Sequence, residues 1–176
     1  MKTSTLSIND VLRFANHDYM NQIHLIKMNL DLDRVEEAKS IIERLSEHSK
    51  TLSNINYLKL PKTVEWLQTI QWRYPAFDSS IISNVTFPVD MKKDEQIVEY
   101  LEKTVIHVYD TLDPFTEQQL EITIESNDSS FNLLFDLKGK WEVDLFDNHN
   151  ENNNLKVQTY VQTNEQWKYA LSIEQE

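Results

Sequence analysis

The sequence predicts an α+β protein in which an antiparallel helical hairpin is followed by a mostly antiparallel sheet backed by helices. Apolar residues recur every three or four positions through the first third of the chain, as they do on one face of a helix. Short runs rich in β-branched and aromatic residues, separated by turn-forming residues, fill the last third and are typical of antiparallel strands. Because the two patterns occupy separate parts of the chain, they indicate the α+β class.

The first predicted helix begins after Ser7 and reaches about Asn29. Ser7 and Asp10 have the spacing of an N-terminal capping pair. The helix carries one continuous apolar stripe, made of Ile8, Leu12, Ala15, Tyr19, Ile23, Ile26 and Leu30. We expect this stripe to face a core.

The second predicted helix begins near Asp33 and Glu36, which repeat the capping spacing, and ends near Ser53. Its apolar positions are Val35, Ala38, Ile42, Leu45 and Leu52. Only about three residues separate the two helices, so they must fold back as an antiparallel hairpin. Two helices cannot cover both apolar stripes, and pairing with a second copy into a four-helix bundle is the simplest way to cover them.

The rest of the chain mixes helix and strand patterns. We expect helices at 62–74, after Pro61, and at 94–112, before Pro114. Strands are expected at 80–89, 119–126, 130–138, 140–146, 155–163 and 167–175, and a polar, Asn-rich loop at 148–154. This division gives two domains, 1–57 and 58–176.

Charge and composition exclude several classes of function. The formal net charge of −12 lies wholly in residues 61–176, because residues 1–60 hold eight basic and eight acidic residues. Such acidity argues against nucleic acid as a partner, since phosphates need a basic surface. With no cysteine, the chain has no disulfide and no thiolate metal site. With one glycine, Gly139, a Gly-rich phosphate-binding loop is not expected.

The sequence also argues against membrane insertion. Its apolar runs are far shorter than the roughly 20 residues that cross a bilayer, and no signal peptide is visible at the start. We therefore expect a cytoplasmic protein with no membrane partner.

His17 is the candidate reactive residue. It lies about 240° around the helix from Ile23, which points it away from the apolar stripe. An imidazole titrates near pH 6.5, so a neutral ring nitrogen is available at pH 7. Asp18 can hydrogen-bond one ring nitrogen and leave the other as a nucleophile, while Arg13 and Asn21 can hold an acidic group. On spacing alone, a plain surface histidine is the simpler interpretation.

The other histidines give no metal site. His24 shares the face of His17, but two ligands without a third make a poor zinc site. His48 is expected to be solvated on the second helix, and His149 falls in the Asn-rich loop.

The stretch NHDYMNQIHLIKMNLDL, residues 16–32, resembles the H-box of the sporulation phosphorelay phosphotransferase B family and of citrate-type and quorum-type sensor histidine kinases. The shared core is His-Asp-x-x-Asn, matched by His17, Asp18 and Asn21. Lys27 and Asn29, together with KTLSNI at 50–55, extend the likeness to the phosphotransferase.

This resemblance implies a function in phosphoryl transfer. It implies a homodimeric four-helix bundle with an exposed histidine that is phosphorylated, and a second domain that resembles a degenerate histidine-kinase ATPase domain. The donor and acceptor would be aspartates of response-regulator receiver domains, and Mg²⁺ would come from the regulator, so the chain would need no cofactor of its own. The implied catalytic residues are His17, Asp18 and Asn21, and the implied regulator-binding residues are Arg13, His24 and Lys27.

Both nucleotide motifs of the kinases are impaired in this sequence. Where citrate-type kinases have Asn-x-x-Asp-Asn, residues 107–111 have His107 and Thr111 in place of asparagines and retain Asp110. No Asp-x-Gly-x-Gly follows, because FDLKGKW contains only Gly139. Autokinase activity is therefore not expected, and His107 is expected to be a packed or capping histidine on its helix.

Two alternatives to the phosphotransferase remain open at this point. One is a cytoplasmic sensor histidine kinase that binds ATP in a divergent pocket. The other is a non-catalytic dimeric adaptor whose helices bind response regulators without accepting phosphate.

Overall fold

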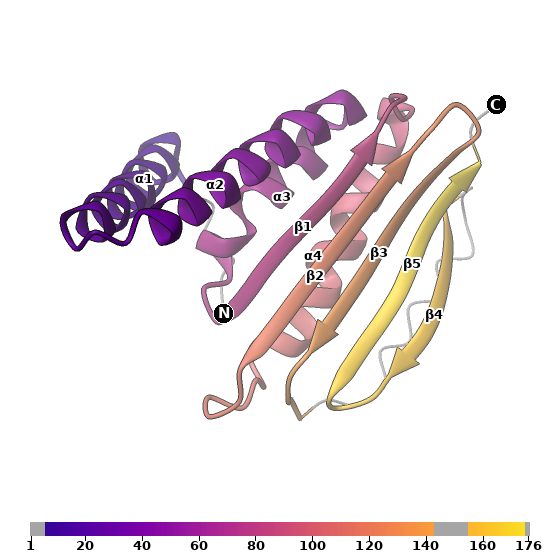
Figure 1. Ribbon diagram of the computed structural model, residues 1–176. Helices are drawn as coiled ribbons and strands as arrows, with labels where there is room; N and C mark the ends of the chain where they lie inside the picture. The colour runs from indigo at the N-terminus through magenta and orange to yellow at the C-terminus, as the bar shows by residue number, and fades with distance from the viewer. Residues whose placement is uncertain (1–5, 143–154, 175–176) are drawn as a thin grey trace. The chain divides into compact units, whose positions relative to one another are not determined.

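The computed structural model describes residues 6–142 and 155–174 and divides the chain into two compact units (Figure 1). The first is the helical hairpin, residues 2–53, and the second extends from Asn54 onward. In the hairpin, α1 spans Ile8–Asp31 and α2 spans Val35–Ile55. Both predicted helices and the three-residue connection between them are confirmed.

The start of α1 has the predicted capping box. The Ser7 hydroxyl accepts a hydrogen bond from the Asp10 backbone N–H at 3.2 Å, and the Ser7 N–H donates to the Asp10 carboxylate at 3.2 Å. The hydrogen bonds from the side chain and backbone of Ser7 lower the pKa of Asp10. Two backbone N–H groups of the first turn, otherwise without helical partners, are satisfied in this way.

The end of α1 differs from the prediction. Asp33 was expected to cap α2, but it adopts a φ of 57°, and α2 begins only at Val35. The Asp33 N–H donates to the carbonyl of Leu30 at 3.1 Å, and the Arg34 N–H donates to that of Asn29 at 2.8 Å. This pair of bonds is a Schellman motif, in which Asp33 takes the left-handed position that glycine usually occupies. The predicted cap on α2 is therefore wrong, and Asp33 terminates α1 instead.

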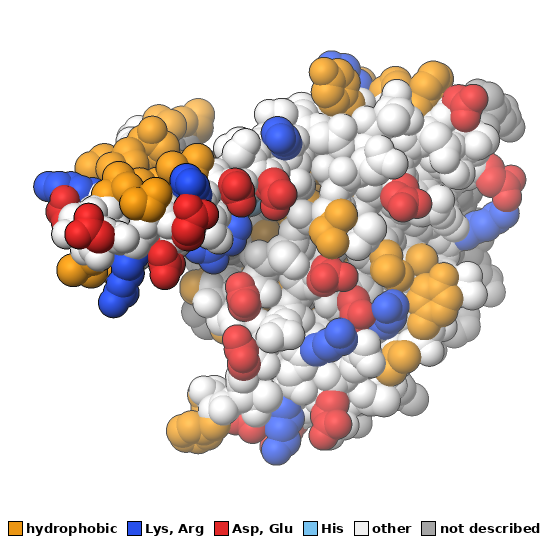
Figure 2. All heavy atoms as spheres, in the orientation of Figure 1, with side chains coloured by type: hydrophobic (Ala, Val, Ile, Leu, Met, Phe, Trp, Pro, Cys, Tyr) orange, Lys and Arg blue, Asp and Glu red, His pale blue; other side chains and the backbone are white. Residues whose placement is uncertain are grey.

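The apolar stripe of α1 is not buried in the single chain. Its members Ile8, Leu12, Tyr19, Ile23 and Leu30 are between 36% and 80% exposed, and α1 has no buried residue. The stripe is too wide for a single helical hairpin to cover, because two helices bury only a narrow line on each other. The stripe therefore needs a further surface to cover it, and its predicted burial in a four-helix bundle of two copies stays a prediction. Figure 2 shows apolar side chains gathered over the hairpin helices.

The second unit begins with helices. A short helix, η1, spans Asn56–Leu58, and α3 spans Pro61–Arg73 with proline in its first turn, as predicted. The predicted helix at 94–112 is α4, Asp94–Tyr109, preceded by η2, Met91–Lys93. It ends three residues early, where the Thr111 N–H and hydroxyl both donate to the Val108 carbonyl at 3.1 Å.

Five strands form one mixed sheet in the order β1-β2-β3-β5-β4. The β1–β2 pair is parallel and the other pairs are antiparallel, which confirms the mostly antiparallel prediction. The strands are β1 Phe77–Val85, β2 Gln118–Ser126, β3 Ser130–Lys138, β4 Lys156–Gln162 and β5 Gln166–Glu174. The strand predicted at 80–89 is found at Phe77–Val85, and Pro88, which cannot donate to a strand ladder, lies beyond its end.

One predicted strand, 140–146, is not formed over its described part. Trp141 makes only an isolated bridge with Leu112, and residues 143–146 lie outside the described residues. The Asn-rich loop predicted at 148–154 also lies outside them.

Helices cover one face of the sheet, with α4 behind the strands in Figure 1. On this face Phe135 stacks on Tyr169 with ring centroids 4.8 Å apart, and the Tyr169 hydroxyl donates to Thr104 of α4 at 3.3 Å. Burial raises the pKa of Tyr169 well above its usual value. The opposite face is open, and in Figure 2 it carries acidic and basic side chains side by side.

Asp94, the first residue of α4, caps the neighbouring helix α3. Its buried carboxylate accepts hydrogen bonds at 2.8 Å from the backbone N–H groups of Lys62 and Thr63 and from the Thr63 hydroxyl. These N–H groups belong to the first turn of α3, where the helix has no partner for them and where its dipole favours an anion. This contact ties α3 to α4.

Replacing Asp94 with Ala should therefore destabilise the second unit by about 2 to 4 kcal/mol, since it leaves buried donors unpaired. Urea unfolding followed by tryptophan fluorescence measures this, because all four tryptophans lie in residues 54–176. Glu95→Ala is the matched control, since Glu95 makes only an exposed ion pair with Lys62 at 2.8 Å. Equal midpoints for the two variants would contradict the assigned role of Asp94.

Candidate functional site

His17 lies on the outer surface of α1, with its side chain 70% exposed. Its Nδ1 is 3.3 Å from an Asp18 carboxylate oxygen and 3.2 Å from the Asn21 side-chain nitrogen. Asn21 reaches the ring because residues four apart on a helix lie one above the other. Within the described part of the chain, Nε2 has no hydrogen-bond partner, so this nitrogen points to solvent.

The two contacts at Nδ1 determine which nitrogen of the His17 ring carries the proton. An ionised carboxylate only accepts hydrogen bonds, so the contact with Asp18 requires a proton on Nδ1 and leaves the lone pair on Nε2. The Asn21 amide can accept from the same N–H if it turns its oxygen toward the ring, since the two ends of an amide are interchangeable by rotation. The tautomer held by Asp18 is therefore the one with a nucleophilic Nε2.

Arg13 lies one helical turn before His17. One of its terminal nitrogens is 3.2 Å from the Asp10 carboxylate, and the guanidinium carbon lies 5.1 Å from the centre of the Phe14 ring. The capping carboxylate of Asp10 thus also holds the arginine, and Phe14 supports it through a cation–π contact. Spacing had placed Arg13 on the face of His17, but it gave no sign of the Phe14 contact.

The structure does not bring His24 or Lys27 into contact with His17. Both are exposed on α1, and neither makes a hydrogen bond or ion pair within the described ranges. His24 lies two turns beyond His17 on the same face, and Lys27 lies about 80° to one side of that face. Their predicted role in regulator binding requires a partner and no contact within the chain.

His107, which stands where the kinases have an asparagine, is half-buried in the second unit. Its ring lies edge-on to Trp167 with centroids 5.9 Å apart, in the last turn of α4. The prediction of a packed histidine at this position is confirmed.

Gly139 has a structural role in packing. A Cβ atom at this position would lie 1.8 Å from Oε1 of Gln118, whose side chain is buried. That oxygen accepts from the Lys140 N–H at 3.1 Å, and the amide nitrogen of Gln118 donates to the carbonyls of Asp113 and Thr116 at 3.0 Å each. The glycine therefore makes room for a side chain that ties two loops together.

Gly139→Ala should destabilise the second unit by about 2 to 4 kcal/mol, because Gln118 must leave its buried hydrogen bonds. In a Gln118→Ala background the same substitution should have an effect of less than about 1 kcal/mol, because the obstructing atoms are gone. Urea unfolding of the two single variants and the double variant measures the difference. Additive losses would contradict this account of the glycine.

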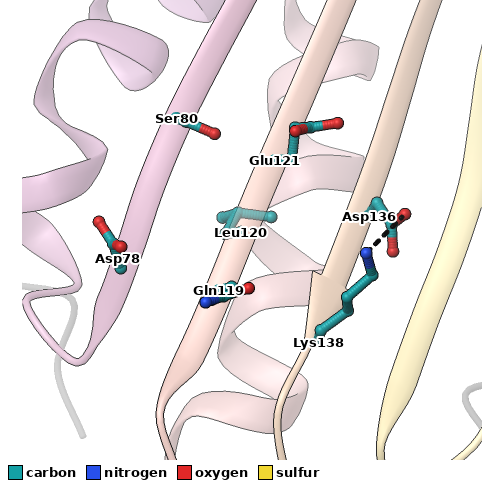
Figure 3. A pocket seen from close by; sticks show the side chains of 7 residues that line it. All are labelled: Asp78, Ser80, Gln119, Leu120, Glu121, Asp136 and Lys138. Atoms are coloured by element: carbon teal, nitrogen blue, oxygen red, sulfur yellow. Dashed lines mark ion pairs between the residues drawn. The ribbon is translucent and has the colours of Figure 1, made fainter.

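The open face of the sheet has a shallow hollow, lined by Asp78, Ser80, Gln119, Leu120, Glu121, Asp136 and Lys138 (Figure 3). Burial alone would raise the pKa of Asp136, but hydrogen bonds from Gln166 at 2.8 Å and Lys168 at 3.0 Å hold it below its usual value. Its carboxylate is thus already satisfied by the sheet. Among the described residues no cluster of three or more His, Cys, Asp or Glu side chains is placed to hold a metal ion.

In the described ranges, no helix combines the length and the apolar character that a membrane span requires.

Comparisons with known proteins bear on the helical hairpin first. Residues 1–58 match the family model of the alpha-helical domain of SpoOB-type sensor kinases. Sporulation initiation phosphotransferase B of Bacillus subtilis (strain 168) is 24% identical over 148 residues, which cover 81% of this chain and 76% of the relative.

Solved structures of histidine kinases are similar over much of the chain. Acinetobacter baumannii histidine kinase AdeS gives a TM-score of 0.41 at 13% identity, covering 90% of this chain and 97% of that one. Histidine kinase ThkA, in complex with response regulator protein TrrA, gives 0.45 at 12% identity, covering 96% of this chain and 62% of that one.

The family match covers the whole of α1 and α2, including His17, Asp18 and Asn21. It confirms the resemblance inferred from residues 16–32. The hairpin is thus similar to the alpha-helical domain of SpoOB-type sensor kinases, and most of the chain is distantly similar to sporulation initiation phosphotransferase B.

Proposed function

We propose that this chain is a phosphotransferase of a sporulation-type phosphorelay. His17 takes a phosphoryl group from the aspartyl phosphate of one response regulator and passes it to an aspartate of a second. The observation that carries the proposal is the exposed imidazole on a SpoOB-type helical domain, with Nδ1 beside Asp18 and Asn21 and Nε2 facing solvent.

The first step is an in-line attack on phosphorus. The Nε2 lone pair forms the N–P bond while the bond from phosphorus to the aspartate oxygen breaks, and its electron pair leaves with the carboxylate. The proton on Nδ1 stays in place, and Asp18 at 3.3 Å balances the positive charge that develops on the ring. In the second step, an aspartate of the other regulator attacks the same phosphorus and Nε2 leaves.

Neither step needs ATP, because an acyl phosphate and a phosphohistidine are both high-energy species. Catalysis then rests on positioning and charge neutralisation, as in other phosphoryl transfers. We assign Mg²⁺ to the acidic pocket of the regulator, and no cofactor to this chain. We assign contacts with that acidic partner to Arg13, His24 and Lys27. Residues 1–60 have a net charge of zero, which favours the approach of an acidic protein.

The active form in this proposal is a homodimer. The exposed stripe residues Tyr19 and Ile23 lie about 160° and 120° around α1 from His17, so pairing of two hairpins covers them and leaves the histidine outside. A four-helix bundle built from two hairpins is the arrangement that uses both stripes. Residues 1–57 would then carry dimerisation and transfer.

Residues 58–176 are proposed to form an ATPase-like domain that does not bind ATP. The packing of His107 on Trp167 and the space that Gln118 fills beside Gly139 both support this part of the proposal.

Labelled ATP separates the phosphotransferase from a kinase. The chain incubated alone with ATP labelled at the γ-phosphate should remain unlabelled, while a receiver domain labelled on its aspartate should transfer its label to the chain. Labelling by ATP alone would identify a kinase with a divergent pocket. A regulator complex that forms without any labelling of the chain would identify an adaptor.

A further inference from the structure

The described methionines all lie at the surface. Met20 is 46% exposed, Met28 is 48% exposed and Met91 is 67% exposed, and none of the three contributes to the core. The chain has no cysteine, so its oxidisable sulfur atoms are all methionine thioethers. Exposed thioethers are oxidised to sulfoxides by hydroperoxides.

Two of these methionines share the face of His17. Met20 follows His17 by three residues and lies about 60° to one side of it, at roughly 100° per residue. Met28 follows His17 by eleven residues and lies about 20° to the other side. Leu25, 41% exposed, lies about 80° from His17 on the Met28 side. We name Met20, Leu25 and Met28 the methionine face of α1.

The methionine face borders the apolar stripe at Met20 and lies away from it at Met28. Tyr19 and Ile23 lie about 180° and 140° around α1 from Met28, so a bundle formed through the stripe leaves Met28 uncovered. Met20 lies about 100° from Tyr19 and only about 60° from Ile23, at the edge of the stripe. Exposed apolar side chains beside a reactive histidine are suited to contact with a docking protein, and methionine adapts well to such surfaces.

We propose that Met20 and Met28 are oxidation sites that regulate docking of the response regulator at His17. This inference rests on the proposed function, since the regulator is the protein that would cover the face. A hydroperoxide transfers its outer oxygen to the thioether sulfur, and its O–O bond breaks. The sulfur is thereby oxidised to a sulfoxide, and the peroxide is reduced to water or an alcohol.

The sulfoxide changes what the face can bind. It is polar and stiffer than the thioether, so an apolar contact made by Met20 or Met28 becomes a polar group that has no partner when it is buried. Methionine sulfoxide reductases return the thioether, which makes the change reversible. Met91 lies on η2 of the other unit and provides an internal control.

The test uses the full chain and a receiver domain from the same genome. The chain is treated with hydrogen peroxide, the peroxide is removed with catalase before mixing, and mass spectrometry of peptides confirms the added oxygen at each methionine. The Kd for the unphosphorylated receiver and the rate of transfer from the phosphorylated receiver are then measured. Wild type, Met91→Leu and the double variant Met20→Leu/Met28→Leu are compared, since leucine keeps the apolar contact and resists oxidation.

Oxidation should weaken receiver binding by about tenfold or more in wild type and Met91→Leu, and by less than about twofold in the double variant. Treatment with methionine sulfoxide reductases should restore wild type. Equal losses in wild type and the double variant, or unchanged binding by oxidised wild type, would overturn the proposal. Absence of transfer by untreated wild type that still binds the receiver would contradict the proposed function alone, and absence of binding would overturn both.

Discussion

Replacing His17 with Gln should lower the rate of phosphoryl transfer from a phosphorylated receiver by at least about a thousandfold, with the fold unchanged. Glutamine keeps a polar side chain of similar reach but has no nitrogen lone pair that can attack phosphorus, so only the nucleophile is lost. His17 makes no contact with the core, because its side chain is 70% exposed. The rate is measured by mixing the chain with the labelled receiver, stopping the reaction at timed intervals without acid, and following the label on the chain.

The matched control is His24→Gln, on the same face two turns farther along α1. It removes an imidazole without touching Asp18 or Asn21, so it should keep transfer within about tenfold of wild type. Loss of transfer in both variants would point to a general effect on docking. Persistent labelling of the His17→Gln variant would show that the phosphoryl group is carried elsewhere.

The double substitution Tyr19→Glu/Ile23→Glu should convert a dimer to single chains. Two carboxylates in the centre of an apolar helix seam would be buried without partners, which is costly enough to prevent association. Sedimentation velocity should show the mass fall from twice 20.9 kDa to 20.9 kDa per particle. Transfer should fall with it, if the regulator docks on the assembled bundle.

His24→Glu adds the same kind of charge on the outward face of α1 and should leave the mass unchanged. A wild-type chain that sediments as a single copy at micromolar concentration would contradict the homodimer. A double variant that keeps the mass of wild type would show that the stripe is not the seam.

The hairpin was predictable because its signals are local. The capping pair Ser7 and Asp10 and the three-residue connection each depend on residues within one helical turn, and both were found as expected. Asp33 was misread because a capping carboxylate and a left-handed helix end use the same residue types. The periodic pattern indicated which face of α1 is apolar but gave no information on what covers it, so burial of the stripe by a second copy stays a prediction.

The second unit depended more on contacts between distant residues. The strand predicted at 130–138, from a run of apolar and aromatic residues that follows turn-forming residues, is β3 with those bounds, Ser130–Lys138. The cap that Asp94 provides for α3 and the room that Gly139 leaves for Gln118 join residues more than twenty positions apart. No local pattern predicts such pairs. In the sequence, Gly139 as the single glycine indicated only that a Gly-rich phosphate-binding loop is not expected.

The candidate site was predicted in its centre and not in its surroundings. Asp18 was expected to hydrogen-bond one ring nitrogen of His17, and the structure has an Asp18 oxygen 3.3 Å and the Asn21 side-chain nitrogen 3.2 Å from Nδ1. The support of Arg13 by Phe14 and the exposure of Met20 depend on side-chain orientation, which spacing alone leaves undetermined.

The central claim is that His17 carries the phosphoryl group, and the chemical stability of the label tests it most directly. The chain is mixed with a receiver domain phosphorylated on aspartate, and the labelled chain is exposed to acid and to base and mapped by peptide mass spectrometry. The account predicts a phosphate on His17 that survives base, is lost in acid and moves to a second receiver. A label that is stable in acid, maps to another residue or never forms would contradict it.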